Sequence, residues 1–162
     1  MRSKRLFWWW FAALATLGLV LVASGHLSES ARAEEATRLN NLGVAYMNQQ
    51  RFEKALALFQ QAYELDPALE LARLNQGIAL LNLQRYEAAR ETLLAVTRQE
   101  PQNARAWYNL GLLYKNRGQA EQALKAFEQV AQLDPNDADT HYFRGLLHTQ
   151  LQDYESAIGA YR

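Results

Sequence analysis

Few side chains in this sequence combine the chemistry and the spacing of a catalytic or metal-binding site. His141 and His148 lie seven residues apart, so on a helix they would share one face and could ligate a metal ion. The remaining histidine is His26, and Ser28 and Ser30 lack histidine and aspartate partners at the spacing of a catalytic triad. The sequence contains no cysteine and no glycine-rich phosphate loop. We therefore expect no enzymatic activity, no cofactor and no metal.

The elements that carry these side chains repeat along the sequence. Glycine, proline and alanine recur at one constant interval, at Gly43, Gly77, Gly111 and Gly145, at Pro67, Pro101 and Pro135, and at Ala55, Ala89, Ala123 and Ala157. A fixed period of this length indicates one supersecondary unit repeated in a stack. The pattern is helical, without period-two alternation, so it predicts two helices per unit, such as 104–117 and 120–133. Each of the three complete units ends in a proline turn.

The period divides the chain into an N-terminal segment (1–33) and four units. The units are 36–69, 70–103, 104–137 and an incomplete fourth, 138–162. Residues 24–35 are small, polar and charged, which is typical of a linker. Close helix contact is predicted between Gly43 and Ala55, between Gly77 and Ala89, and between Gly111 and Ala123. We expect Gly111→Leu to lower the melting temperature sharply and Gly118→Ala to change it little.

The N-terminal segment predicts export. Three basic residues, Arg2, Lys4 and Arg5, precede an uncharged run, Leu6–Ala23, that as a helix would span roughly 27 Å of bilayer. Basic residues remain in the cytoplasm, so the body is predicted to be periplasmic or extracellular. The run is either a signal peptide, cleaved near 31–33 or 23–25, or a retained membrane anchor with tryptophans 8–10 at the interface. A buried helix is a third interpretation.

The third unit, 104–137, carries the residues of a known repeat signature. Its signature residues are Trp107, Leu110, Gly111, Tyr114, Ala123, Phe127 and Pro135. Their spacing resembles the tetratricopeptide repeat, W-x2-L-G-x2-Y…A-x3-F…P. The resemblance implies an all-α, right-handed superhelical solenoid of about three and a half repeats whose first helices line the concave face. His141 and His148 stand where the family has Trp and Tyr, so we interpret both as packing residues. Because the fourth unit stops inside its second helix, we expect a longer polypeptide, or else pairing of this end with another chain.

The concave face implied by the resemblance is the candidate peptide-binding site. Asn41, Asn75 and Asn109 recur once per repeat, and a row of amides could pair with the backbone of an extended peptide. A similar asparagine ladder occurs in the O-linked N-acetylglucosamine transferase; local hydrogen bonding is the alternative. The other site residues are Leu74, Ile78, Arg105, Tyr108, Leu112 and Tyr142. The apolar residues of this set form an exposed strip, which either binds a partner protein or is covered by another part of the same chain. Of the family's carboxylate-clamp positions, only Asn75 and Arg105 fit, which argues against a clamp.

Charge narrows the class of partner. Residues 34–162 carry 13 basic and 16 acidic side chains, a net charge of −3 that disfavours nucleic acid. The sequence therefore predicts a non-catalytic scaffold that binds a protein or peptide outside the cytoplasmic membrane, with residues 6–23 in the membrane if they are not cleaved. One alternative is a recruitment or oligomerisation arm of a larger exported protein whose effector domain follows residue 162. Another is an anchored factor for envelope assembly. The sequence leaves the oligomeric state open.

Overall fold

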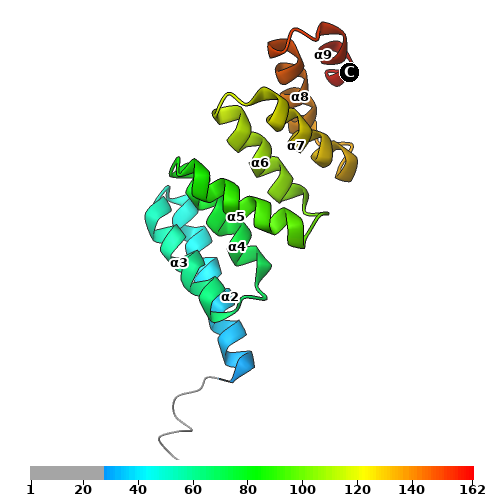
Figure 1. The fold of residues 1–162 in the computed structure, drawn as a ribbon. Helices are drawn as coiled ribbons and strands as arrows, with labels where there is room; N and C mark the ends of the chain where they lie inside the picture. Colours follow the sequence, from blue (N-terminus) through cyan, green and yellow to red (C-terminus); the bar gives the residue numbers. More distant parts are fainter. Residues whose placement is uncertain (1–27) are drawn as a thin grey trace, which may run out of the picture.

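Residues 28–162, the part of the chain that the computed structural model describes, fold into helices joined by short turns, with no strand (Figure 1). The helices are α2 (Glu29–Asn48), α3 (Phe52–Leu65), α4 (Glu70–Asn82), α5 (Tyr86–Gln99), α6 (Ala104–Asn116), α7 (Ala120–Leu133), α8 (Ala138–Gln150) and α9 (Tyr154–Ala160). The predicted all-α fold is confirmed.

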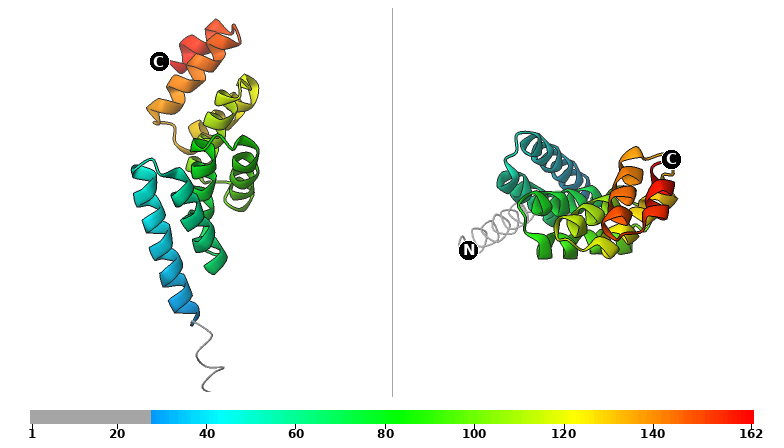
Figure 2. Two further views of the ribbon diagram at one scale, coloured as in Figure 1. Left: turned by 90° about the vertical axis from the view of Figure 1, so that its left-hand side faces the viewer. Right: turned by 90° about the horizontal axis from the view of Figure 1, so that it is seen from above.

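The helices pair into hairpins that stack in chain order. Within each hairpin the two helices contact each other, and α3, α5 and α7 also pack against the first helix of the next hairpin. In addition α2 contacts α4, and α4 contacts α6, whereas the second helices make no comparable contacts with one another. The hairpins follow an arc rather than a straight line (Figure 2). The first helices α2, α4 and α6 therefore lie along one side of the stack, and α8 continues it through the contact of its Phe143 with Tyr108 of α6. We call this side the first-helix face.

Side chains and prolines fix where the helices begin and end. The side chains of Asn103 and Asp137 accept hydrogen bonds from backbone amides in the first turns of α6 and α8. Asp66 and Asp134 leave the helical conformation immediately before a proline, as predicted. The predicted linker 24–35 is wrong in part, because α2 already begins at Glu29, behind a capping serine.

The turn inside each hairpin requires a left-handed residue. Gln50, Gln84, Gly118 and Gln152, which occupy the same place in successive repeats, have φ angles of 57°, 56°, 69° and 62°. A side chain at such an angle costs roughly 1–2 kcal/mol. The expectation that Gly118→Ala changes little is therefore corrected, because alanine would be strained there even though nothing lies within 4 Å of the added carbon.

The recurring helix glycines make room for a large side chain. A Cβ on Gly111 would lie 2.7 Å from Cζ of Phe127, and one on Gly43 would lie 2.5 Å from Cε1 of Phe59. The same relation joins Gly77 to Leu93 and Gly145 to Tyr161. The atoms nearest to each missing Cβ belong to the residue one helical turn beyond the recurring alanine of the same unit. The three rings and the one leucine need the space of the missing Cβ.

The membrane segment predicted at Leu6–Ala23 lies outside the described residues. Between residues 28 and 162, no helix is both long enough and apolar enough to cross a bilayer.

Candidate binding face

An aliphatic row runs along the first-helix face. Its members are Val44, Ile78, Leu112 and Leu146, which occupy equivalent positions on α2, α4, α6 and α8. Val44 and Leu146 keep 38% and 40% of their surface exposed, and Ile78 and Leu112 are half-buried. Leu71 and Tyr142 add further exposed apolar surface on α4 and α8. Apolar residues at the same position of every repeat indicate a surface that can contact a long segment.

The three equally spaced asparagines do not form a uniform ladder. Asn41 is exposed on α2. Asn75 is only 7% exposed, and its amide nitrogen donates to Oδ1 of Asn40 at 2.8 Å. Asn109 donates to the backbone oxygen of Arg105 at 2.7 Å, inside its own helix. The alternative of local hydrogen bonding holds for Asn109, and Asn75 is a bridge between α2 and α4, so each amide nitrogen already uses one of its two N–H groups inside the protein.

Asn75 and Asn109 have different environments because the repeats before them place different residues opposite their side chains. Asn75 meets Asn40 of the repeat before it, and an amide pair can satisfy itself at this buried contact. The residue at the same distance before Asn109 is Leu74, which has no side-chain acceptor. Leu74 itself is 1% exposed and belongs to the core. It is therefore corrected from a binding residue to a packing residue.

Three of the predicted site residues do come together. Arg105, Tyr108 and Asn109 of α6 line a pocket of about 320 Å³. The rest of the wall comes from α7, from the turn that follows it and from the first residues of α6 and α8, namely Ala104, Val130, Asp134, Asp137 and Asp139. We call this the Tyr108 pocket. Tyr142 lies outside it, in a separate hollow beside Pro135 and Tyr161.

The Tyr108 pocket is acidic. It holds three carboxylates and one guanidinium. Asp137 accepts from the backbone amide and the hydroxyl of Thr140, and Asp134 accepts from the amide of Asn136 at 3.2 Å. Burial raises the pKa of the Tyr108 phenol above its usual value, and the charges of Asp139 and Asp137 raise it further. The phenol therefore stays neutral at physiological pH, as a hydrogen-bond donor in an electronegative site.

Aromatic packing holds Tyr108 in place. Its ring meets Phe127 edge-on at 5.6 Å and Phe143 at 6.2 Å, while Phe127 and Phe143 stack at 5.1 Å. The Lys115 ammonium lies 5.3 Å from the Phe143 ring. Because Phe127 is fully buried and Phe143 comes from the next unit, the orientation of Tyr108 depends on the contact between the third and fourth repeats.

Sequence reasoning missed part of the pocket wall. Asp134 and Asp137 were not among the predicted site residues, although a periodic signal was present: Asp66, Glu100 and Asp134 lie one repeat apart, each directly before a proline. Together with the acids that begin the following helices they form an acidic edge of the first-helix face. Its members are Asp66, Glu70, Glu100, Asp134, Asp137 and Asp139.

The two helix histidines have structural partners. Nε2 of His141 lies 2.7 Å from the backbone oxygen of Pro135. One repeat earlier, Nε1 of Trp107 donates to the backbone oxygen of Pro101 at 2.9 Å. Nδ1 of His148 lies 3.3 Å from a carboxylate oxygen of α9's capping residue, Asp153. Both histidines thus have polar partners within the protein, and residues 28–162 contain no group of three or more potential metal ligands.

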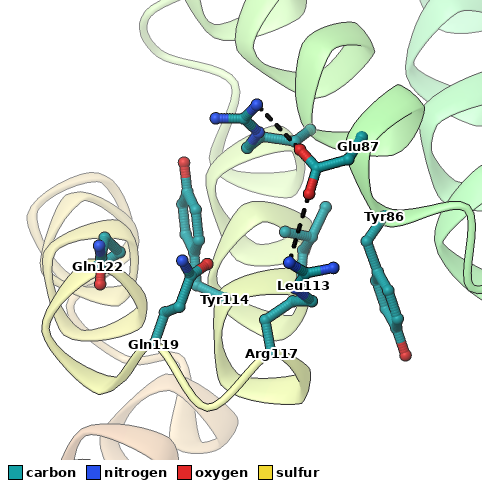
Figure 3. A pocket seen from close by; sticks show the side chains of 8 residues that line it. Tyr86, Glu87, Leu113, Tyr114, Arg117, Gln119 and Gln122 are labelled. Atoms are coloured by element: carbon teal, nitrogen blue, oxygen red, sulfur yellow. Dashed lines mark ion pairs between the residues drawn. The ribbon is translucent and has the colours of Figure 1, made fainter.

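A second pocket, of about 190 Å³, lies between the second and third repeats (Figure 3). Glu87 of α5 projects between two arginines, with 2.9 Å to Nη2 of Arg90 and 3.4 Å to Nη2 of Arg117. The Arg117 guanidinium also lies over the Tyr86 ring at 5.6 Å. The Glu87 carboxylate pairs with one arginine of its own helix and with Arg117 at the end of α6, so the cluster links neighbouring repeats. Its charged groups already pair with one another, which makes this pocket a weaker candidate for ligand binding than the Tyr108 pocket.

Comparisons with known proteins give the same architecture. Three family models, each described as tetratricopeptide repeat, match residues 15–70, 46–113 and 104–137. No curated protein matches the sequence.

Solved structures resemble the fold closely. MamA (residues 41 to the end) from Desulfovibrio magneticus RS-1 is 28% identical with a TM-score of 0.71, over 78% of this chain and 71% of that one. A crystal structure of MamA is 21% identical with a TM-score of 0.73, over 82% of both chains. The first such repeat domain of Spaghetti (RPAP3), bound to the HSP90 peptide SRMEEVD, is 19% identical with a TM-score of 0.70, over 74% of this chain and 95% of that one.

Proposed function

Because the chain belongs to the tetratricopeptide repeat family, we propose that it is a non-catalytic scaffold that holds a peptide or a segment of another protein on its first-helix face. The observation that carries this proposal is the aliphatic row, which repeats in all four units and is partly exposed in each. A repeated apolar position on neighbouring helices suits a segment that runs along the stack. The peptide-bound RPAP3 domain, similar in fold, supports binding of this kind.

The candidate face offers recognition chemistry rather than catalysis. Its polar groups at the Tyr108 pocket are carboxylates, one guanidinium, an amide and a neutral phenol. Within residues 28–162 no histidine, serine and carboxylate converge there, and both helix histidines have their own partners. Binding energy at such a face comes from apolar burial and from charge complementarity.

We further propose that the scaffold works outside the cytoplasmic membrane. The basis is the basic N-terminus followed by the uncharged run Leu6–Ala23. Mass analysis of the protein from membrane and soluble envelope fractions tests this: a mature chain that begins after the run supports a signal peptide, and a full-length membrane-bound chain supports an anchor. A full-length chain in the cytosol contradicts the proposed location.

Site-specific photo-crosslinking tests the proposed binding face. A photoreactive phenylalanine is placed at Val44 or Leu146, which are exposed members of the aliphatic row. Gln61 on α3 and Glu91 on α5, exposed residues of second helices, are the matched controls. We expect covalent adducts with a protein partner in living cells at the two row positions and none at the controls. Equal labelling at all four positions, or no adduct at the row, would refute the binding face.

A further inference from the structure

The carboxylates of the acidic edge outnumber the basic side chains beside them, as in the Tyr108 pocket, where three carboxylates face one guanidinium. The four ion pairs among residues 28–162 join other residues, and none includes a carboxylate of the acidic edge. The cations nearest in sequence are Arg73, Arg98, Arg105 and the half-buried Arg144. Arg73 donates to Gln99 and lies over a tyrosine ring, and Arg105 is exposed at the pocket rim. The edge therefore presents excess negative charge beside the aliphatic row.

Two of these acids even contact each other. The side chains of Glu70 and Glu100 share a hydrogen bond, which raises the pKa of Glu70 above its usual value. Like charges held together disfavour the ionised pair in the free protein. A cation placed beside them would relieve that repulsion, so the arrangement favours a positively charged neighbour.

The Tyr108 pocket has the shape and lining for a long basic side chain. The Tyr108 ring and Val130 supply apolar wall, and the carboxylates of Asp134 and Asp139 stand in the same lining. Lysine and arginine bury an aliphatic stem while keeping the charged head at a polar rim. A cation also gains from an aromatic face. The volume of about 320 Å³ is ample for one such side chain.

Resting on the proposed function, we propose that the partner is a basic segment. It lays aliphatic side chains along Ile78 and Leu112 and inserts a lysine or arginine into the Tyr108 pocket. This is the reverse of an acidic peptide such as the SRMEEVD bound by the RPAP3 domain. Charge complementarity selects between the two, because a carboxylate at this pocket would meet three others.

Two fluorescent peptides test the partner's charge. Both are short and extended with identical aliphatic residues; one carries lysines and the other glutamates at the same positions. Binding to the full-length chain is followed by fluorescence anisotropy. We expect the lysine peptide to bind at least about tenfold more tightly, and its affinity to fall as NaCl rises from roughly 0.05 to 0.5 M.

Charge-neutral variants locate the contact. Asp134→Asn with Asp139→Asn is expected to weaken the lysine peptide about fivefold to tenfold, since each exposed pair contributes a few-fold. Glu91→Gln with Glu121→Gln, the matched control on the second helices α5 and α7, removes the same charge and leaves binding unchanged. Asp137 is retained because it caps α8. Circular dichroism confirms that both variants remain folded.

The outcomes separate this inference from the proposed function. Preference for the lysine peptide, lost only in the pocket variant, supports the basic partner. Equal binding of both peptides, or equal weakening by both double variants, overturns it. If crosslinking at the aliphatic row succeeds while the glutamate peptide binds more tightly than the lysine peptide, the proposed scaffold function is supported and the proposal of a basic partner is wrong. If neither peptide binds and the row gives no adduct, both fail.

Discussion

The contact between Gly111 and Phe127 gives the sharpest test of how the repeats are held together. Alanine at position 111 would place its Cβ 2.7–2.8 Å from three ring atoms of Phe127. The ring cannot retreat easily, because it is fully buried and packed by Tyr108 and Phe143. Replacing glycine by alanine inside a helix raises the free energy of unfolding by about 1 kcal/mol through helix propensity alone. Overpacking of a buried site costs about 1–3 kcal/mol, so we expect a net loss of up to about 2 kcal/mol.

Gly159 provides a matched control. It also lies inside a helix, α9, but nothing is within 4 Å of the added carbon. Gly159→Ala is therefore expected to gain up to about 1 kcal/mol. At roughly 4 °C per kcal/mol for a domain of this size, Gly111→Ala should melt about 4–12 °C below Gly159→Ala.

Thermal unfolding followed by circular dichroism measures the difference. Adding Phe127→Leu to Gly111→Ala should recover about 1 kcal/mol relative to the sum of the two single changes, because a smaller, more flexible side chain can yield. The reasoning is refuted if Gly111→Ala raises the melting temperature as much as Gly159→Ala does. Weaker binding of the lysine peptide by Gly111→Ala is also expected, since Phe127 supports Tyr108.

Three further predictions concern turns, buried amides and acidity. Gln84→Gly should raise, and Gly118→Ala should lower, the free energy of unfolding by about 1 kcal/mol in urea titrations, because both positions have positive φ. Asn75→Ala should cost about 1–3 kcal/mol by leaving a buried amide without its partner, whereas Asn109→Ala should cost less than about 1 kcal/mol in the same assay. Glu70→Gln should raise the melting temperature at pH 7 but not at low pH. The raised pKa of Glu70 means that its protonated form is favoured in the fold, so wild-type stability falls as pH rises through that pKa.

Each of these has an outcome that contradicts it. A stability loss in Gln84→Gly would mean that the turn residue makes contacts beyond its backbone angle. Equal costs for the Asn75 and Asn109 variants would remove the distinction between a bridge and a local bond. A Glu70→Gln protein that is no more stable than wild type at pH 7 would show that its neighbouring carboxyl does not repel it.

The helices and their limits follow largely from the sequence because their determinants are local. The predicted second helix of the third repeat, Ala120–Leu133, has the observed bounds, and the first ends one residue early at Asn116. Proline turns and capping side chains act within a few residues of the helix end. The start of α2 inside the predicted linker 24–35 was missed because Ser28 was not recognised as a helix cap.

The candidate site was predictable only in outline. Repeat position gave Ile78, Arg105, Tyr108 and Leu112 their place on the first-helix face. It could not give the contribution of Asp134, because that residue reaches the pocket from the end of α7 and the turn to the next repeat. Contacts between repeats join residues far apart in sequence, so their signal is visible only where the same residue type recurs.

What the sequence determined by itself was the repeat: one period shared by three residue types, and the two helices within each period. Only the tertiary structure decided which side chains at equivalent repeat positions are buried and which partners they bond to. Asn75 is buried and bonded because Asn40 faces it, whereas Asn109, one repeat later, bonds within its own helix. Equal spacing fixes where a side chain points, but the neighbouring helix determines whether it is covered, and that neighbour differs from repeat to repeat.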